Sequence, residues 1–201
     1  MVNDEALAVV DTQFPATAAS CLAGLPGRSD RLIDVVINTH HHGDHTSGNG
    51  IFRKAVKSFV AHENVPGLQM ASAAKAGKGQ TPVVADETFA TSWRRELGDE
   101  VVTAQYFGNA HTSGDAIVHF EKANDVHMGD LVFNRMYPYI DVPSGANVQH
   151  WITVLEEAMK NYPSDAIYVS GHGKAEFGVE GTQDDLEVFR DHLSAMLEHV
   201  S

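Results

Sequence analysis

The chain has 201 residues, of which 43% are hydrophobic and 20% are charged, and its formal net charge is −13. This composition is typical of a globular protein, and the length is sufficient for one sizeable hydrophobic core. The acidic balance argues against a nucleic acid as partner, because binding to a phosphate backbone usually requires a basic surface.

The location and domain organisation follow from what the chain lacks. No run is apolar enough to cross a bilayer and no leader-like pattern is present, so we expect no membrane partner and a soluble protein, either cytoplasmic or exported after removal of a leader. No tract rich in Ser, Gly and Pro divides residues 1–201, which are therefore predicted to form a single domain. The single cysteine, Cys21, lies in the apolar stretch AASCLAGL and is predicted to be a buried structural thiol.

In chain order, seven apolar runs predict strands, and helical patterns alternate with some of them. The runs span residues 6–10, 34–38, 58–62, 101–107, 116–121, 125–129 and 166–171. Apolar residues at spacings of three and four predict helices over 147–162 and from 182 to the C-terminus, and 63–76 is predicted to be helical too. The stretch 70–95, with Trp93, is a candidate flap. Strands in both meander and alternating order indicate an α/β fold of two sheets packed face to face and covered by helices.

The segment THHHGDH at residues 39–45 carries the strongest chemical signal. His40 and His42 can project to one side of an extended chain, whereas His41 alternates away and is expected to pack or to face solvent. Asp44 and His45 follow a glycine that permits a sharp turn. Imidazole and carboxylate groups at this spacing suit a borderline divalent cation and require no cysteine.

Three later positions could supply further ligands. His111 lies in GNAHTSGD, Asp130 in HMGDLVF and His172 in VSGHGK, each just after a predicted strand. Because loops that follow different strands can converge on one rim of a sheet, we expect these side chains to meet the 40–45 segment.

The order His-x-His-x-Asp-His, then isolated His, Asp and His, resembles the metallo-β-lactamase-fold hydrolases from about residue 6 to the C-terminus. Asp11, in VVDTQF, resembles an early structural aspartate of that family, although Gln13 replaces the glycine that is usual nearby. The resemblance implies a four-layer αββα sandwich of the metallo-β-lactamase type. Because the family usually has strands before this element, some N-terminal strands are expected to be lacking, which would leave a shortened domain. The uncovered sheet edge could then pair with a second copy in a homo-oligomer.

The resemblance also implies the roles of the seven residues. His40, His42 and His111 would hold one metal ion, Asp44, His45 and His172 would hold a second, and Asp130 would bridge the two. Two Zn²⁺ are expected, and His/Asp ligation is also compatible with manganese or iron. The implied reaction is hydrolysis of a small-molecule substrate by a hydroxide held between the ions, with Asp44 as the catalytic residue that orients it.

Asp130 narrows the choice among the branches of the family. It resembles the bridging aspartate of the second glyoxalase and the lactonases, whereas two β-lactamase subclasses have cysteine or serine at this position. An ester, thioester, lactone or amide substrate is favoured. A β-lactamase and a metal-binding module without turnover remain as alternatives, and a nuclease is disfavoured by the charge.

Candidate substrate-binding residues lie on loops near the predicted ligands. Asn134, Tyr137 and Tyr139 follow Asp130 and could line the pocket, although the tyrosines could equally cover the core. Lys174, two residues after His172, could meet an anionic group of the substrate or could be a surface lysine.

Overall fold

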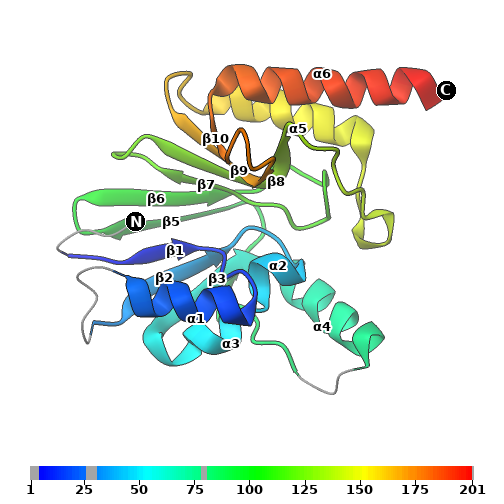
Figure 1. The fold of residues 1–201 in the computed structure, drawn as a ribbon. Helices are drawn as coiled ribbons and strands as arrows, with labels where there is room; N and C mark the ends of the chain where they lie inside the picture. Colours follow the sequence, from blue (N-terminus) through cyan, green and yellow to red (C-terminus); the bar gives the residue numbers. More distant parts are fainter. Residues whose placement is uncertain (1–4, 26–30, 78–80, 201) are drawn as a thin grey trace.

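The computed structural model describes residues 5–25, 31–77 and 81–200, and it contains two β-sheets that stack face to face with helices on both outer sides (Figure 1). The first sheet is wholly parallel, in the order β1 (Ala8–Val10), β2 (Ile33–Asn38), β3 (Val56–His62) and β4 (Glu87–Phe89). The second sheet has the order β10 (Glu180–Gly181), β9 (Ile167–Gly173), β8 (Asp125–Asn134), β7 (Ile117–Phe120), β6 (Glu100–Gln105) and β5 (Ser92–Leu97). Its strands are antiparallel except for the parallel pair β8–β9.

The helices form the two outer layers of the sandwich. In Figure 1, α1 (Pro15–Gly24) and α3 (Asn49–Phe52) lie below the first sheet, and α5 (Val148–Asn161) and α6 (Gln183–Val200) lie above the second. The remaining helical segments are α2 (Gly43–Thr46), α4 (Val65–Ala76) and the short 3₁₀ turns η1 (Arg53–Ala55) and η2 (Val142–Ser144).

Three apolar cores separate the four layers. Neighbouring strand residues point to opposite faces of a sheet, so Val36 packs towards the outer helices while Ile37 packs between the sheets. Strand β3 repeats the pattern with Phe59 and Val60. A parallel sheet that is buried on both faces requires such continuous apolar runs. The third core lies between the second sheet and α5 and α6, where Trp151 is fully buried.

The architecture confirms the prediction of an αββα sandwich, and each of the seven predicted strands overlaps an observed strand. The predicted helices over 63–76, 147–162 and 182 onwards are confirmed as α4, α5 and α6. The strands β4, β5 and β10 and the helices α1, α2 and α3 were not predicted from the sequence. The expected N-terminal shortening and the single-domain organisation stay predictions. Within the described residues, no helix combines the length and apolar character needed to span a bilayer.

Two predictions for individual side chains were wrong. Cys21 is exposed rather than buried, because α1 turns Ala18 and Leu22 towards the first sheet and leaves the thiol on its outer side. Trp93 belongs to no flap: it is only 7% exposed, lies on β5 opposite Ala104 of β6, and packs in the core between the sheets. Cross-strand pairing and burial of its large ring hold this segment in the sheet.

The core beneath α6 predicts a contrast between two residues of that helix. Leu193 is fully buried and Val188 is 51% exposed. We expect Leu193→Ala to lower the free energy of unfolding by about 2–5 kcal/mol, because it removes buried apolar atoms and leaves a cavity. The matched control Val188→Ala should change it by no more than about 0.5 kcal/mol. Urea titration followed by circular dichroism measures both, and equal effects would contradict the assigned orientation of the helix.

Candidate metal centre

The segment that follows β2 brings the first four candidate ligands together. The chain leaves β2 at Asn38, passes through His40 and His42, and turns at Gly43 into the single-turn helix α2, which carries Asp44 and His45. Nε2 of His40 lies 3.1 Å from Nδ1 of His42.

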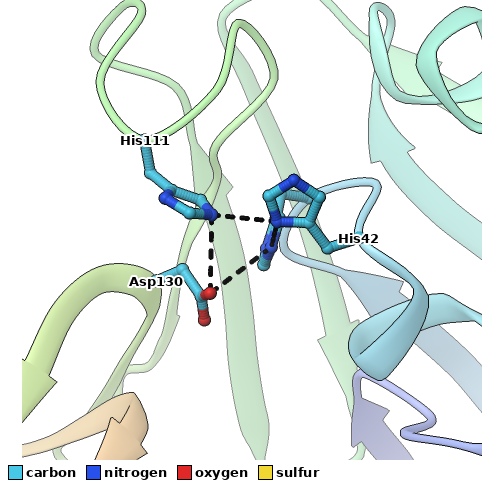
Figure 2. A group of neighbouring side chains, drawn as sticks. His42, His111 and Asp130 are labelled. Carbon is cyan, nitrogen blue, oxygen red and sulfur yellow. Dashed lines mark hydrogen bonds and ion pairs between the residues drawn. The ribbon is translucent and has the colours of Figure 1, made fainter. Parts of the chain in front are cut away.

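One group of donor atoms forms around this pair of rings. Nε2 of His111, from the loop between β6 and β7, lies 3.0 Å from Nδ1 of His42. Oδ2 of Asp130, on β8, lies 3.6 Å from Nε2 of His40 and 3.5 Å from Nε2 of His111. Figure 2 shows His42, His111 and Asp130 pointing towards one another from separate segments. The four side chains offer donor atoms close enough together to hold one metal ion.

A second group lies next to the first. Oδ2 of Asp44 is 3.1 Å from Nε2 of His172, on β9, and 3.7 Å from Nε2 of His45. These three residues also could hold a metal ion. Asp130 borders this group as well, since Oδ1 lies 3.0 Å from Nε2 of His45 and Oδ2 lies 3.3 Å from Nε2 of His172. The structure therefore brings all seven predicted residues into one cluster, with the Asp130 carboxylate between its two halves.

The position of Asp130 depends on glycines in two neighbouring segments. Gly129 has a φ of +54°, and a Cβ there would lie 2.7 Å from Oγ1 of Thr39. A Cβ on Gly171 of β9 would overlap Oδ1 of Asp130 itself. The pairing of β8 with β9 shifts in register around this point. Asp130 thus lies inside β8, at an irregularity, and not after the end of the strand as predicted.

Hydrogen bonds from behind the cluster orient two of its imidazoles. The carboxylate of Asp11 lies 2.7 Å from Nδ1 of His45 and accepts hydrogen bonds from the backbone N–H and the hydroxyl of Thr39, at 2.8 and 2.7 Å. Oγ1 of Thr39 in turn lies 3.1 Å from Nδ1 of His40. Each of these rings therefore keeps its Nε2 directed into the cluster, an arrangement typical of metal-ligating histidines.

The loop after β8 orients the other two imidazoles of the first group. Nδ1 of His111 lies 2.9 Å from the backbone oxygen of Tyr139, and Nε2 of His42 lies 2.9 Å from Oδ2 of Asp141. His42 thus presents Nδ1, and His111 presents Nε2, to the shared space. Sequence reasoning missed Asp141, because a single aspartate in an irregular loop has no spacing that distinguishes it from a surface residue.

Gln13, which replaces the glycine usual near Asp11 in the family, keeps a backbone conformation that glycine adopts easily. Both residues have positive φ angles, +58° for Gln13 and +56° for Asp11. Glycine adopts this conformation without steric cost, so the backbone shape is retained although the usual glycine is replaced. The backbone oxygen of Gln13 accepts a hydrogen bond of 2.7 Å from the N–H of Gly48, just after α2.

His41, as predicted, does not face the cluster. Its ring is buried, and Nε2 lies 3.3 Å from Oγ of Ser144 on η2. Together with His42 and Asp141 it forms a third group of donor atoms, but Nε2 of His42 already contacts the Asp141 carboxylate at 2.9 Å.

In the first group, the electrostatics favour the ligand forms of the side chains. Burial holds the pKa of His40 well below its ordinary value and lowers that of His111 to about 4, so both rings stay neutral near pH 7. Burial tends to raise the pKa of Asp130, but the facing imidazoles outweigh this and keep its carboxyl group ionised. Hydrogen bonds to Asp130 and Asp44 raise the pKa of His172 to about 9. Binding of a cation in the second group should therefore release a proton.

Two buried atoms support the fit of a metal ion. Nε2 of His45 and Oδ1 of Asp130 form no hydrogen bond with any residue that the structure describes, although they lie only 3.0 Å apart. A cation between the two halves of the cluster would satisfy both atoms. The donors are nitrogen and oxygen atoms without sulfur, which suits zinc, manganese or iron.

A cleft of about 470 Å³ opens over the cluster. It is lined in part by four cluster residues, His42, Asp44, Asp130 and His172. Two of the four predicted substrate-binding residues, Tyr137 and Tyr139, line this cleft.

The other two do not. Asn134 is buried and donates a hydrogen bond of 3.0 Å to the backbone oxygen of Gly178, and it does not border the cleft. Lys174 extends to Glu176, with Nζ 3.1 Å from Oε2. Neither residue borders this cleft, and their roles in substrate binding stay predictions.

Comparison with known proteins agrees with this geometry. The family model of the metallo-beta-lactamase superfamily matches residues 1–172. Over 146 residues the chain is 24% identical to metallo-beta-lactamase IND-1 of Chryseobacterium indologenes, an alignment that covers 72% of this chain and 57% of that protein. The chain thus spans less than two thirds of the length of this relative.

Solved structures show the same fold. A metallo-beta-lactamase from Pontibacter korlensis has a TM-score of 0.76 at 23% identity, over 96% of this chain and 85% of the other. One from Hirschia baltica has a TM-score of 0.68 at 21% identity, over 92% and 79%. The chain belongs to the metallo-beta-lactamase superfamily.

The cluster predicts that a divalent metal stabilises the fold. After removal of metal with a chelator, addition of Zn²⁺ to 100 times its dissociation constant should raise the free energy of unfolding by about 2.7 kcal/mol, because the ion binds the folded state. Differential scanning calorimetry measures the accompanying rise in Tm. Asp130→Asn, which weakens a donor of both groups, should lose most of this rise, whereas the exposed control Asp165→Asn should keep it. No rise in the wild type would contradict the assignment.

Asp141 predicts an effect on metal affinity from outside the ligand set. Asp141→Ala removes the acceptor that orients the His42 ring and should weaken metal binding by about 10–100-fold, while Asp141→Asn, which keeps an acceptor oxygen, should weaken it less. Competition with a chromogenic chelator gives the dissociation constants. Equal affinities for the wild type and Asp141→Ala would show that this contact does not hold the ring.

Proposed function

We propose that this protein is a dinuclear zinc hydrolase that acts on a small carbonyl substrate, an ester, thioester, lactone or amide. The observation that carries the proposal is the convergence of the seven side chains into two adjacent donor groups that share Asp130. Two ions held there would lower the pKa of water to about 7 and so supply a hydroxide nucleophile at neutral pH.

The residues of the chain divide the remaining tasks. Three imidazoles of the first group, from His40, His42 and His111, would hold one ion, and Asp44, His45 and His172 would hold the other. The Asp130 carboxylate, facing both groups, would reduce the repulsion between two dications. Each ring is already oriented by a hydrogen bond or by packing, so little reorganisation would accompany ligation.

Asp44 is the best candidate for a direct role with the nucleophile. Its side chain is about one third exposed and borders the cleft, and its Oδ2 contacts the second group. The His172 contact lowers the pKa of the Asp44 carboxyl group, so it is an acceptor at neutral pH. It can therefore accept a hydrogen bond from an attacking water or hydroxide and orient it towards a carbonyl carbon.

The lining of the cleft supports an uncharged reacting group. Among the described residues that border it there is no Lys or Arg. Two basic side chains that are close in sequence to the cluster residues extend elsewhere, Lys174 to Glu176 and Arg135 towards Asp185. A carbonyl compound fits this lining better than a phosphodiester, and the net charge of −13 points the same way.

β-Lactam hydrolysis is the second candidate, favoured by the relatives, which are named metallo-beta-lactamases. A chromogenic cephalosporin added to zinc-loaded protein tests it directly. Turnover would place this protein with those relatives in activity, and its absence alongside ester or lactone turnover would favour the first proposal. Bound zinc with no turnover of any of these substrates would instead indicate a metal-binding module.

The role of Asp44 predicts a separation between metal content and rate. In Asp44→Asn we expect kcat on the best substrate of an ester, thioester, lactone and amide panel to fall by about 10²–10⁴-fold. Plasma mass spectrometry should find at least one zinc retained, because the first group is intact. The exposed control Asp165→Asn should keep both rate and metal. Unchanged kcat in Asp44→Asn would rule out the proposed orienting role.

A further inference from the structure

A second cavity, which we call the side pocket, lies between the end of β8 and α6. It has a volume of about 320 Å³, within the range of small-molecule sites. Its walls are mainly apolar, with Val132 and Phe133 on the β8 side and Val188 and Phe189 on the α6 side. None of the seven cluster residues borders it.

The side pocket adjoins the cleft over the cluster. Phe133, Met136 and Tyr137 border both cavities. Phe133 forms the dividing wall: its ring stacks on His172 with centroids 5.2 Å apart and on Phe189 at 6.2 Å. Tyr137, which borders both cavities, is 84% exposed, and its ring lies 5.5 Å from that of His192. A molecule whose reacting group lies at the cluster could therefore extend past Tyr137 into the side pocket.

The charges at the side pocket compensate one another. Arg135 and Asp185 both border it, and their side chains approach to 3.9 Å. The Arg135 guanidinium also lies 5.7 Å from the ring centre of Phe177. Because the cation has an anion and an aromatic ring as partners, it is a weak attractor for a charged ligand, and the apolar walls dominate.

We propose that the side pocket binds an uncharged, apolar arm of the substrate, alkyl or aryl, while the carbonyl of the same molecule lies at the cluster. This inference rests on the proposed hydrolase function and narrows its substrate class to compounds with such an arm. Burial of each methylene group in an apolar pocket favours binding. The value of kcat/KM should therefore rise with the length of the arm.

The test compares three esters on zinc-loaded protein by proton release. Methyl acetate has no arm, methyl hexanoate carries it on the acyl side, and hexyl acetate carries it on the alcohol side. We expect kcat/KM for at least one hexyl-length ester to exceed that for methyl acetate by about tenfold or more. The better of the two identifies which side of the carbonyl enters the side pocket.

Two variants connect this preference to the pocket. Val188→Glu places a charge in the α6 wall at a half-exposed position and should reduce the preference to about twofold or less, with zinc content unchanged. Ile167→Glu is the matched control, 48% exposed at the start of β9 and outside both cavities, and it should keep the preference.

A binding measurement separates this inference from the proposed function. The uncleavable ketone 2-octanone should bind the wild type more tightly than acetone in ligand-observed NMR, and Val188→Glu should abolish the difference. If no ester is hydrolysed but this binding is found, the hydrolase proposal fails and the side pocket stands. If the esters are hydrolysed at equal kcat/KM, or, where none is hydrolysed, 2-octanone binds no better than acetone, the inference is overturned.

Discussion

The fold is organised around one buried carboxylate. Asp130 is 4% exposed and faces imidazoles of His40, His45, His111 and His172. A buried charge is costly unless it is compensated, so these rings or a cation must accompany it. His40 and His45 follow a strand of the first sheet, whereas Asp130 and His172 belong to the second. Compensation of this single charge therefore joins the two sheets at one end of the sandwich.

The side chains around the cluster act as two supports, one on each side. Behind it, Asp11 and Thr39 hold His45 and His40; in front of it, the loop after β8 holds His42 and His111 through Asp141 and the backbone of Tyr139. The same loop carries the tyrosines that border the cleft. The orientation of the candidate ligands and the shape of the cleft above them therefore both depend on the loop after β8. A change in that loop should alter both.

The cleft and the side pocket together suggest how a substrate would be oriented at the cluster. Polar donors collect at the cluster, and apolar walls continue along the end of β8 towards α6. Phe133 takes part in both, since it packs against a candidate ligand and against the α6 wall. A polar reacting centre next to an apolar extension is the common form of a small-molecule site, in which a few polar groups fix orientation and apolar contacts provide affinity.

The positions of most strands and the candidate ligand set were determined by the sequence alone, because both are encoded in local patterns. Apolar runs such as 34–38 specify strands by their own pattern, and the spacing of His40, His42, Asp44 and His45 identifies a candidate ligand set before any fold is known. What only the tertiary structure decided is which distant groups meet. Asp141 contacts His42, which is 99 positions away in the sequence. Lys174, which was expected near a substrate, instead contacts the neighbouring Glu176. Cys21 and Trp93 lie opposite to expectation because helix rotation and strand pairing depend on long-range packing, of which local composition contains no record.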